Sequence, residues 1–379
     1  MERQTIQPKG LKMAGAYSPV VRAGDLVFIS GCTGINKEGK LSPDIHSQIK
    51  QVLENIKYCL EAAGTSFSNL MKTKVFLTDW TQYSALNEVY SQSFSPEAAA
   101  ARSTIKAEAL PGSELITIEA IATVGEKKII RTPGVKSRRP GVIKCARTGD
   151  FLFTGGFVGN YNYDTPDWKY GPDIQSQTKQ TMENIKQVIE AAGSSLDKIL
   201  RILLLINDRA DFEAMDEIYR SYFSPNMLPT RMAFEHPSSG PIFNELMEIY
   251  AIATVGKKEV IYPPGMKPPG PWSPVVRASD FVFVSGLTGR GKDGRLASDI
   301  RSQTKQTLDN IKVSLEAAGS SLDKVVRVLV FLTDIRNLKT MDEVYSSYFA
   351  KAGFPTRTAV QMNRSTDPEL ITMEVIAAV

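Results

Sequence analysis

The chain has 379 residues, of which 42% are hydrophobic and 23% are charged, and its formal net charge is only +4. These values are typical of an ordinary globular protein, and the length accommodates three domains of common size. The basic residues are spread out, apart from a short basic stretch at 136–139 that we interpret as a solvated linker. The charge therefore gives no indication of nucleic-acid binding.

The few cysteines and histidines limit the chemistry that the chain can carry out. Cys32, Cys59 and Cys145 are odd in number and lack metal-ligand spacing, which argues against a disulfide framework and for a reducing compartment. His46 and His236 are not at equivalent positions, so a histidine triad or metal site is not expected. The first residues lack an apolar signal segment, and no apolar run approaches the length of a membrane span. We therefore expect a cytoplasmic protein without a metal, cofactor or membrane partner.

The first third of the chain alternates between strands and helices. A short strand at 20–22 and a buried strand at 26–30 come first, and Gly31 ends the second. The next segment is predicted to be a helix, because one apolar stripe follows helical spacing: Ile49, Val52, Leu53, Ile56 and Leu60. Gly64 is a natural stop for this helix. The remaining elements are expected at 75–77 (strand), 86–94 (helix), 102 onward (strand) and 115–124 (strand). The order is β-β-α-β-α-β-β.

This unit is present three times. Residues 17–22 and 27–31 return at 272–277 and 282–286, and a middle copy keeps 150–156. Near the end of each unit an Arg is followed 17 residues later by a Glu, and these pairs are Arg102/Glu119, Arg231/Glu248 and Arg357/Glu374. On this spacing we align the three glutamates without an insertion. The period is too long for a solenoid and predicts three domains, at 1–125, 126–256 and 257–379.

The mixture of hairpins and crossovers predicts the α+β class, with helices on one face of each sheet. The other face is also apolar, and nothing within a single unit covers it. Packing the three sheets against one another would bury these faces, so we expect one chain to form a monomeric pseudo-trimer. An isolated unit would expose a contiguous apolar patch.

The repeated motifs resemble those of the RidA/YjgF/YER057c/UK114 family of reactive-intermediate (imine) deaminases, also called the endoribonuclease L-PSP family. The resemblance covers nearly the whole chain except the linkers. It is carried by the aromatic-serine pairs at 17–18 and 272–273, the Ala-Ala-Gly helix ends at 62–64, 191–193 and 317–319, the Phe-Leu-Thr-Asp strand ends at 76–79 and 331–334, and Phe-Pro-Thr-Arg at 354–357. The resemblance implies three tandem domains of the chorismate mutase-like fold. Their helices would lie outside, an inner β-barrel would form from the sheets, and one site would lie at each interface.

The resemblance also implies a carboxylate-binding anchor in each repeat, at Arg102, Arg231 and Arg357. Family members with deaminase activity carry a Glu two residues before the conserved strand Glu, and it orients the attacking water. On our alignment that position holds Thr117, Leu246 and Thr372. A threonine hydroxyl can position water but is a poor general base. The other strand glutamates, Glu119, Glu248 and Glu374, are expected either to bind substrate or to have a structural role in which they pair with the anchor arginines.

Several further residues are expected to line the clefts, namely Tyr17, Ser30, Gly31, Trp272, Ser285 and Gly286. Repeat 2 has 142–144 in place of the aromatic-serine pair and Gly155 in place of Ser30. We therefore expect a degenerate cleft there, and expect the loss of Arg231 to matter least. The aromatic insert at 161–168 is a lid, a surface for a partner, or merely a longer surface loop.

Three functions remain open at this point. The first is hydrolysis of a small carboxylate-bearing imine or enamine, such as 2-iminobutanoate or 2-iminopropanoate, in clefts between repeats. The second is a non-catalytic protein that binds small 2-oxo acids, which the missing water-orienting glutamates favour. The third is RNA cleavage, against which the small net charge and the lack of paired histidines argue.

Overall fold

The structure is a computed structural model, and it describes residues 1–11, 15–135, 137, 139–161, 169–236, 244–266, 270–349, 353–362 and 368–379. Residues 162–168 of the aromatic insert are outside this set, so the lid and partner-surface hypotheses concern residues that are not described. Residues 136 and 138 of the basic stretch are also outside it.

Repeat 1 folds in the predicted order and gains one additional edge strand at its beginning. Its elements are β1 (Arg3–Ile6), β2 (Val20–Ala23), β3 (Leu26–Thr33), α1 (Ile45–Ala62), β4 (Leu70–Leu77), α2 (Tyr83–Ser93), β5 (Ala100–Lys106) and β6 (Ile116–Thr123). Helix α1 begins where the Asp44 side chain accepts a hydrogen bond from the Ser47 N–H. It ends before Gly64, whose φ of 75° suits a glycine.

Repeats 2 and 3 follow the same plan. Repeat 2 contains β7 (Lys128–Ile130), β8 (Val142–Ile143), β9 (Cys145–Thr148), β10 (Phe151–Thr154), α3 (Ile174–Ala191), β11 (Ile199–Ile206), α4 (Phe212–Ser221), β12 (Thr230–Glu235) and β13 (Met247–Thr254). Repeat 3 contains β14 (Lys258–Ile261), β15 (Val275–Ala278), β16 (Phe281–Thr288), α5 (Ile300–Ala317), β17 (Val325–Leu332), α6 (Leu338–Phe349), β18 (Thr356–Gln361) and β19 (Ile371–Ala378).

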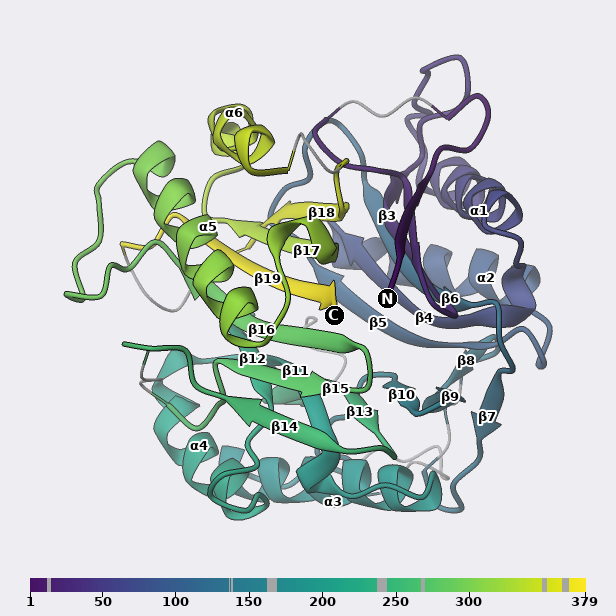
Figure 1. The fold of residues 1–379 in the computed structure, drawn as a ribbon. Helices are drawn as coiled ribbons and strands as arrows, with labels where there is room; N and C mark the ends of the chain where they lie inside the picture. The colour runs from purple at the N-terminus through teal and green to yellow at the C-terminus, as the bar shows by residue number, and fades with distance from the viewer. Residues whose placement is uncertain are drawn as a thin grey trace.

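The linkers are structural parts of the sheets. Each begins with an edge strand that pairs with the first strand of the following repeat, β7 with β9 and β14 with β15. Strand β1 does the same for β2, so repeat 1 also has this edge. The two chain ends meet, because the Met1 amino group donates to the Val379 carbonyl at 2.5 Å, and they lie side by side in Figure 1. The three repeats thus form a closed ring.

The helices lie on the outside and the sheets face one another, as Figure 1 shows. Three apolar cores join each sheet to its own helices. Two further cores combine residues from all three repeats, for example Phe28, Phe151 and Phe281, whose rings pack 5.5 to 6.0 Å apart. These inner cores confirm that the apolar inner faces of the sheets bury one another.

The expectation of an inner β-barrel is corrected by the strand order. The described strands form three separate sheets, β1-β2-β3-β6-β4-β5-β8, β12-β11-β13-β10-β9-β7 and β14-β15-β16-β19-β17-β18, and no closed barrel. The sheets meet mainly through side chains, so no continuous ladder of hydrogen bonds runs around the ring. Strand β8 crosses one interface, where it extends the sheet of repeat 1 beside β5, and an isolated bridge joins Ala109 of repeat 1 to Gln361 of β18.

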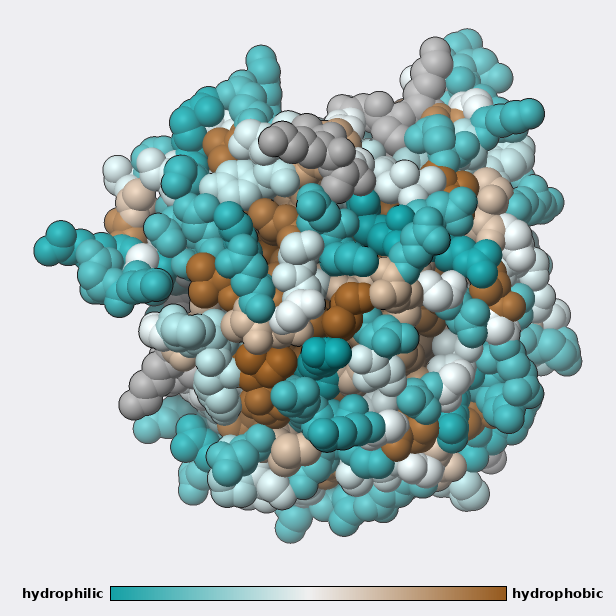
Figure 2. Space-filling model, viewed as in Figure 1, coloured by the Kyte–Doolittle hydropathy of each residue, from teal (hydrophilic) through white to brown (hydrophobic). Residues whose placement is uncertain are grey.

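The distribution of hydrophobic residues on the surface agrees with apolar faces that are buried inside the ring. Figure 2 shows a mostly hydrophilic face, on which hydrophobic residues are confined to smaller areas, mainly toward its middle. Among the helices of the described residues, none combines the length and the apolar character needed to span a membrane.

Candidate functional sites at the three repeat interfaces

Each predicted Arg lies near the start of a strand that borders the neighbouring repeat. The Arg357 N–H donates to Ser30 Oγ of repeat 1, and the Arg231 N–H donates to Ser285 Oγ of repeat 3, both at 2.9 Å. Arg102 meets repeat 2, where its carbonyl accepts from the Gly156 N–H at 3.3 Å. The three sites are therefore interfacial, and each takes its Arg from one repeat and its facing strands from another.

The cleft between repeats 3 and 1 brings together most of the residues predicted for one site. A cavity of about 290 Å³ is lined by Arg357 from repeat 3 and by Tyr17, Ser30, Gly31 and Thr117 from repeat 1. The guanidinium carbon of Arg357 lies 5.2 Å from the centre of the Tyr17 ring.

The hydroxyls of this cleft already have structural partners. Ser30 Oγ donates to the Ser18 carbonyl at 2.7 Å, in addition to accepting from the Arg357 N–H. Thr117 Oγ1 donates to the Cys32 carbonyl at 3.0 Å. Ser30 therefore links the two repeats, and Thr117 can offer a ligand only its lone pairs.

The cleft between repeats 2 and 3 repeats this arrangement with Arg231. Its guanidinium and Trp272 approach the same glycine, Gly270, and Gly286 packs against Thr372 and Met232. Ser285 Oγ donates to the Ser273 carbonyl at 2.7 Å, as Ser30 does in the first cleft. The structure thus combines Arg231 with the intact aromatic-serine segment of repeat 3.

In both of these clefts the anchor Arg is already paired with an acid of its own repeat. Arg357 forms two hydrogen bonds with the Asp342 carboxylate of α6. Arg231 forms the same pair with Asp216 of α4, at 2.5 and 3.2 Å. Such a bidentate pair neutralises the guanidinium, so these two arginines attract a substrate carboxylate less than a free one would.

Arg102, in the cleft between repeats 1 and 2, has no such acid. The position of Asp216 and Asp342 is held by Asn87, whose amide oxygen accepts from Arg102 Nη2 at 2.6 Å. Arg102 Nη1 is buried and has no hydrogen-bond partner among the described residues. Tyr90 lies under the guanidinium, with its ring centre 4.8 Å away. Arg102 therefore keeps its full charge and an unused donor.

The degenerate segment of repeat 2 belongs to this Arg102 cleft. Strand β8 and Gly155, which replace the aromatic-serine pair and Ser30, lie against β5 and the Arg102 backbone. Our sequence-based ranking attached this divergence to Arg231. In the structure, the diverged segment of repeat 2 instead faces Arg102 of repeat 1, so the divergence gives no reason to rank Arg231 last.

The strand register places an unexpected carboxylate in this cleft. On β6, Thr117 is opposite Phe76 and Glu119 is opposite Lys74. On β13, Glu248 is opposite Leu205, which is equivalent to Phe76, and Tyr250 is opposite Leu203, which is equivalent to Lys74. On β19, Thr372 is opposite Phe331, the equivalent of Phe76, and Glu374 is opposite Leu329, the equivalent of Lys74.

Glu248 therefore occupies the position of Thr117 and Thr372, and Tyr250 occupies that of Glu119 and Glu374. Our ungapped alignment of repeat 2 was wrong, because two additional residues lie between Arg231 and β13. The sequence does contain the signal: the motif Ala-Ile-Ala-Thr-Val-Gly ends at Gly125 and Gly256, 131 residues apart (256 − 125), whereas Arg102 and Arg231 are 129 apart (231 − 102).

The Glu248 carboxylate lies close to the backbone that joins the two repeats. A Cβ added at Gly156 would be 1.8 Å from Glu248 Oε1, so only glycine fits there. Gly156 is the residue whose N–H binds the Arg102 carbonyl. The equivalent Gly31 packs in the same way against Thr117, and Thr117 and Arg357 line one cavity. By this equivalence Glu248 and Arg102 face the same cleft.

The surroundings of Glu248 suit a general base. Burial raises the pKa of Glu248 to about 7, although the neighbouring Lys144 and Lys72 lower it. The Tyr250 hydroxyl donates to Glu248 Oε2 at 2.5 Å and lies 3.4 Å from the Thr104 carbonyl. Lys144, which stands where the other repeats have proline, donates to the Gly156 carbonyl at 2.6 Å. Sequence reasoning missed both Tyr250 and Lys144.

Glu119 and Glu374 are not in any cleft, in contrast to the expectation that they pair with the anchor arginines. They point to the centre of the ring, where Arg327 binds both of them. The Arg201 Nε–H donates to both carboxylate oxygens of Glu374, each at 2.9 Å. Glu119 shares a sheet face with Thr117, because the two are two residues apart, but it lies further along β6, where it lines the central cavity instead of the cleft. Thr372 Oγ1 is buried without a hydrogen-bond partner among the described residues.

These features define a class of protein: a ring of three α+β units with interfacial clefts, one of which combines a free cationic anchor with a carboxylate that titrates near neutrality. The sequence model of the family described as Endoribonuclease L-PSP matches residues 8–124, 142–255 and 265–379. The chain belongs to this family, in three fused copies, and its relatives carry the RutC and reactive intermediate deaminase names.

Individual relatives match one repeat each. A RutC family protein from Pyrococcus horikoshii is 42% identical over 123 residues, which is 32% of this chain and 97% of that protein. The chloroplastic Reactive Intermediate Deaminase A of Arabidopsis thaliana is 40% identical over 112 residues, 29% of this chain and 59% of that protein. The crystal structure of Escherichia coli TdcF with bound serine is 31% identical, has a TM-score of 0.30 and covers 32% of this chain and 98% of its own.

Proposed function

We propose that this protein hydrolyses a small imine or enamine that bears a carboxylate, such as 2-iminobutanoate or 2-iminopropanoate, in the cleft between repeats 1 and 2. The observation that carries the proposal is the register of β13, which puts Glu248 at the position of the water-orienting carboxylate in a cleft whose Arg102 is not neutralised. The deaminase names of relatives that match one repeat each support the same reaction class.

Each residue has a distinct role in this proposal. Arg102 holds the substrate carboxylate through its guanidinium, which keeps a buried donor available. Glu248 removes a proton from water while the water oxygen adds to the imine carbon and the C=N electron pair moves to nitrogen. The proton then passes from Glu248 to that nitrogen. Glu248 then takes the hydroxyl proton of the resulting intermediate and passes it to the nitrogen, so that the C–N bond breaks as the carbonyl forms and ammonia and a 2-oxo acid are released.

Two neighbours support Glu248 in this role. The Tyr250 hydroxyl donates to Oε2 and fixes the carboxylate, which leaves Oε1 toward Gly156. Lys144 brings a positive charge to the same backbone and helps to keep Glu248 ionised at neutral pH. Deleting a held general base of this kind commonly lowers a rate by about two to four orders of magnitude.

The other two clefts are proposed to bind small ligands without hydrolysing them. Each has an arginine that is paired with an aspartate, Asp216 or Asp342, and each has Thr372 or Thr117 in place of the carboxylate. One chain would then combine a single catalytic cleft with two non-catalytic ones. We further propose that the chain acts as a monomer, since its own three repeats cover the inner faces of the sheets.

The pH dependence of imine hydrolysis tests the proposal. The base acts only when it is ionised, and its pKa in the folded protein is about 7. After subtraction of uncatalysed hydrolysis, kcat/KM for 2-iminobutanoate is expected to rise about tenfold per pH unit below about pH 7 and to level off above it. Glu248→Gln is expected to remove the inflection and most of the rate, whereas Thr372→Val leaves both unchanged. A wild-type profile that is flat between about pH 5 and 8, or an active Glu248→Gln variant, would contradict the assignment.

A further inference from the structure

A ring of charged residues lies at the centre of the molecule, away from the three clefts. Three equivalent strand positions, on β4, β11 and β17, hold Lys72, Arg201 and Arg327, each opposite an isoleucine of the neighbouring strand. Apolar layers from all three repeats lie on both sides of this ring along the strands: Met71, Leu200 and Val326 precede it, and Phe76, Leu205 and Phe331 follow it. Charged side chains are thus enclosed inside the inner core.

Two substitutions make this ring electrically unbalanced. Three cations opposite three glutamates would form a neutral ring. Repeat 2, however, has Tyr250 where the other repeats have Glu119 and Glu374. In addition, repeat 1 has Lys74 where the others have Leu203 and Leu329, a single cation added to the same layer. Four cations therefore face two carboxylates, which leaves an excess of two positive charges.

Every charged member of the layer is buried. The cations Lys72, Lys74, Arg201 and Arg327 are 2 to 6% exposed, and the two carboxylates are at most 6% exposed. The nearest further carboxylate, Glu248, is held by Tyr250, and counting it still leaves one positive charge in excess. A buried charge without a counter-charge is costly, so this excess calls for a balancing anion or for loss of protons.

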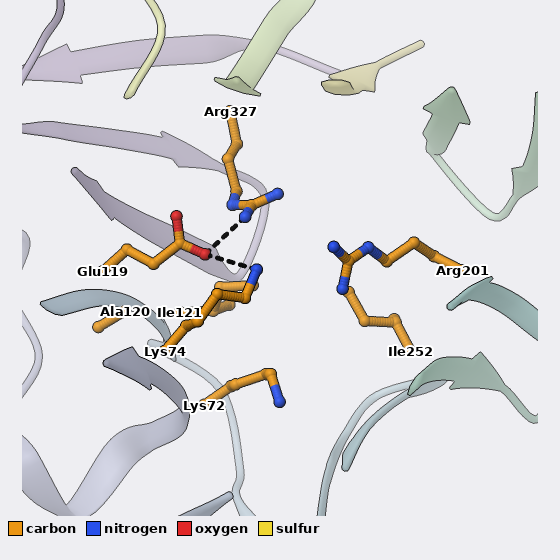
Figure 3. A pocket seen from close by; sticks show the side chains of 8 residues that line it. All are labelled: Lys72, Lys74, Glu119, Ala120, Ile121, Arg201, Ile252 and Arg327. Carbon is orange, nitrogen blue, oxygen red and sulfur yellow. Dashed lines mark hydrogen bonds and ion pairs between the residues drawn. The ribbon is translucent and has the colours of Figure 1, made fainter. Parts of the chain in front are cut away.

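The four cations surround one small cavity. Figure 3 shows Arg201 reaching in from one side toward Lys74 and Arg327, which hold Glu119 between them, while Lys72 lies beside them. Lys74 Nζ is 3.1 Å from Glu119 Oε1, and Lys72 Nζ is bound to Ser103 Oγ at 2.7 Å. The cavity volume is about 10 Å³, which is about the space that a single water requires, so a chloride ion, which is larger, binds only with a small outward shift of the surrounding side chains.

We propose that this cavity is a binding site for one small monovalent anion of the size of chloride, held between Lys74, Arg201, Arg327 and Lys72 at the centre of the ring. The anion balances the charge that the two substitutions leave, and it joins side chains from all three repeats. The cavity is lined by buried side chains and is distinct from the Arg102 cleft, although Lys72 also lies close enough to the Glu248 carboxylate to lower its pKa. The role of the anion is structural.

The lowered pKa values of Lys72 and Lys74 agree with a missing counter-charge. Burial lowers the pKa of Lys74 to about 7, although Glu119 raises it, and burial lowers the pKa of Lys72 well below its ordinary value. A bound anion would keep both lysines protonated. The alternative is that the lysines lose their protons and no anion binds, and the two cases differ in whether halide affects the protein.

Bromide locates such a site directly. Crystals of the full chain grown in sodium bromide are expected to show an anomalous difference peak between Lys74 and Arg201, and crystals of Lys74→Leu are expected to lack it. The Leu side chain is the one present in repeats 2 and 3. Bromide peaks confined to the surface of the wild-type protein would overturn the proposal, even if the variant failed to fold.

Chloride-dependent stability gives a second readout. As chloride replaces gluconate from about 1 to about 300 mM at constant ionic strength, the thermal midpoint of the wild type is expected to rise by a few degrees. Lys74→Leu should show no such rise. Lys258→Leu, which removes a buried lysine of the edge strand β14, should keep it. Equal chloride dependence in wild type and Lys74→Leu would overturn the proposal.

Discussion

Arg102→Ala is expected to lower kcat/KM for 2-iminobutanoate by about 30-fold or more, whereas Arg231→Ala and Arg357→Ala change it by less than about threefold. Losing a buried, charged hydrogen-bond partner costs about 2–5 kcal/mol of binding, and each 1.4 kcal/mol corresponds to about tenfold. Of the three arginines, only Arg102 is available to bind a substrate carboxylate, because the other two are bound to Asp216 and Asp342. Steady-state kinetics of the three single variants measures the effect.

A matched variant separates charge from structure. Asn87→Asp gives Arg102 the acid that the other two repeats have at this position, and it changes only one side-chain atom. It is expected to raise KM strongly and to leave the fold unchanged, because the same pair already exists twice in this chain. If Asn87→Asp had no effect, or if Arg231→Ala or Arg357→Ala proved more harmful than Arg102→Ala, the assignment of the catalytic cleft would be wrong.

Arg327→Leu is expected to lower the free energy of unfolding by about 3–5 kcal/mol, because it removes two buried hydrogen bonds between charged groups, each worth about 1.5–3 kcal/mol. Arg327 binds Glu119 of repeat 1 and Glu374 of repeat 3, and all three side chains are almost fully buried. Arg327 and Lys74 hold the pKa of Glu119 below its ordinary value against the effect of burial. In the variant, Glu119 keeps Lys74 and Glu374 keeps Arg201, so the loss comes from the two buried bonds with which Arg327 joins repeats 1 and 3.

Urea unfolding of Arg327→Leu and of an exposed control tests this expectation. In the control, Arg336→Leu removes an ion pair with Asp334 in which Arg336 is 88% exposed, so no measurable change is expected. Similar small changes in both variants would show that the central ion pairs do not hold the repeats together.

Much of the fold follows from the sequence, for reasons that are local. The apolar stripe of α1 and the run of β3 indicate their elements directly, and the three copies of the unit give the ring. The arginine anchors are also visible, because Arg102, Arg231 and Arg357 are at the same point of each unit. The direction of the ring is not visible, since nothing in a single sequence says which neighbour each Arg faces.

The register of β13 shows why the site was only partly predictable. The Arg-to-Glu spacing of 17 residues occurs in all three repeats, but in repeat 2 it is a coincidence produced by two additional residues and by the shift of the Glu to Glu248. The backbone pairing of β11 with β13 shows which alignment is right, and the spacing of Gly125 and Gly256 is the sequence signal that supports it. Asn87, Asp216 and Asp342 were overlooked for a different reason: on a helix, a polar residue is ordinary, and its contact with the Arg is set by the tertiary fold.

The charged layer was overlooked because Lys72, Lys74, Arg201 and Arg327 interrupt strands that otherwise read as buried apolar runs. Such residues are usually interpreted as edges or surface positions. Here they face the centre because three sheets surround them, which no single repeat reveals.

A crystal of the full chain soaked with 2-oxobutanoate, the product of 2-iminobutanoate hydrolysis, tests the central claim most directly. The account predicts one product molecule between repeats 1 and 2, with its carboxylate bound to Arg102 and its carbonyl carbon facing Glu248. Product bound to Arg231 or Arg357, with the Arg102 cleft unoccupied in the same crystal, would contradict it.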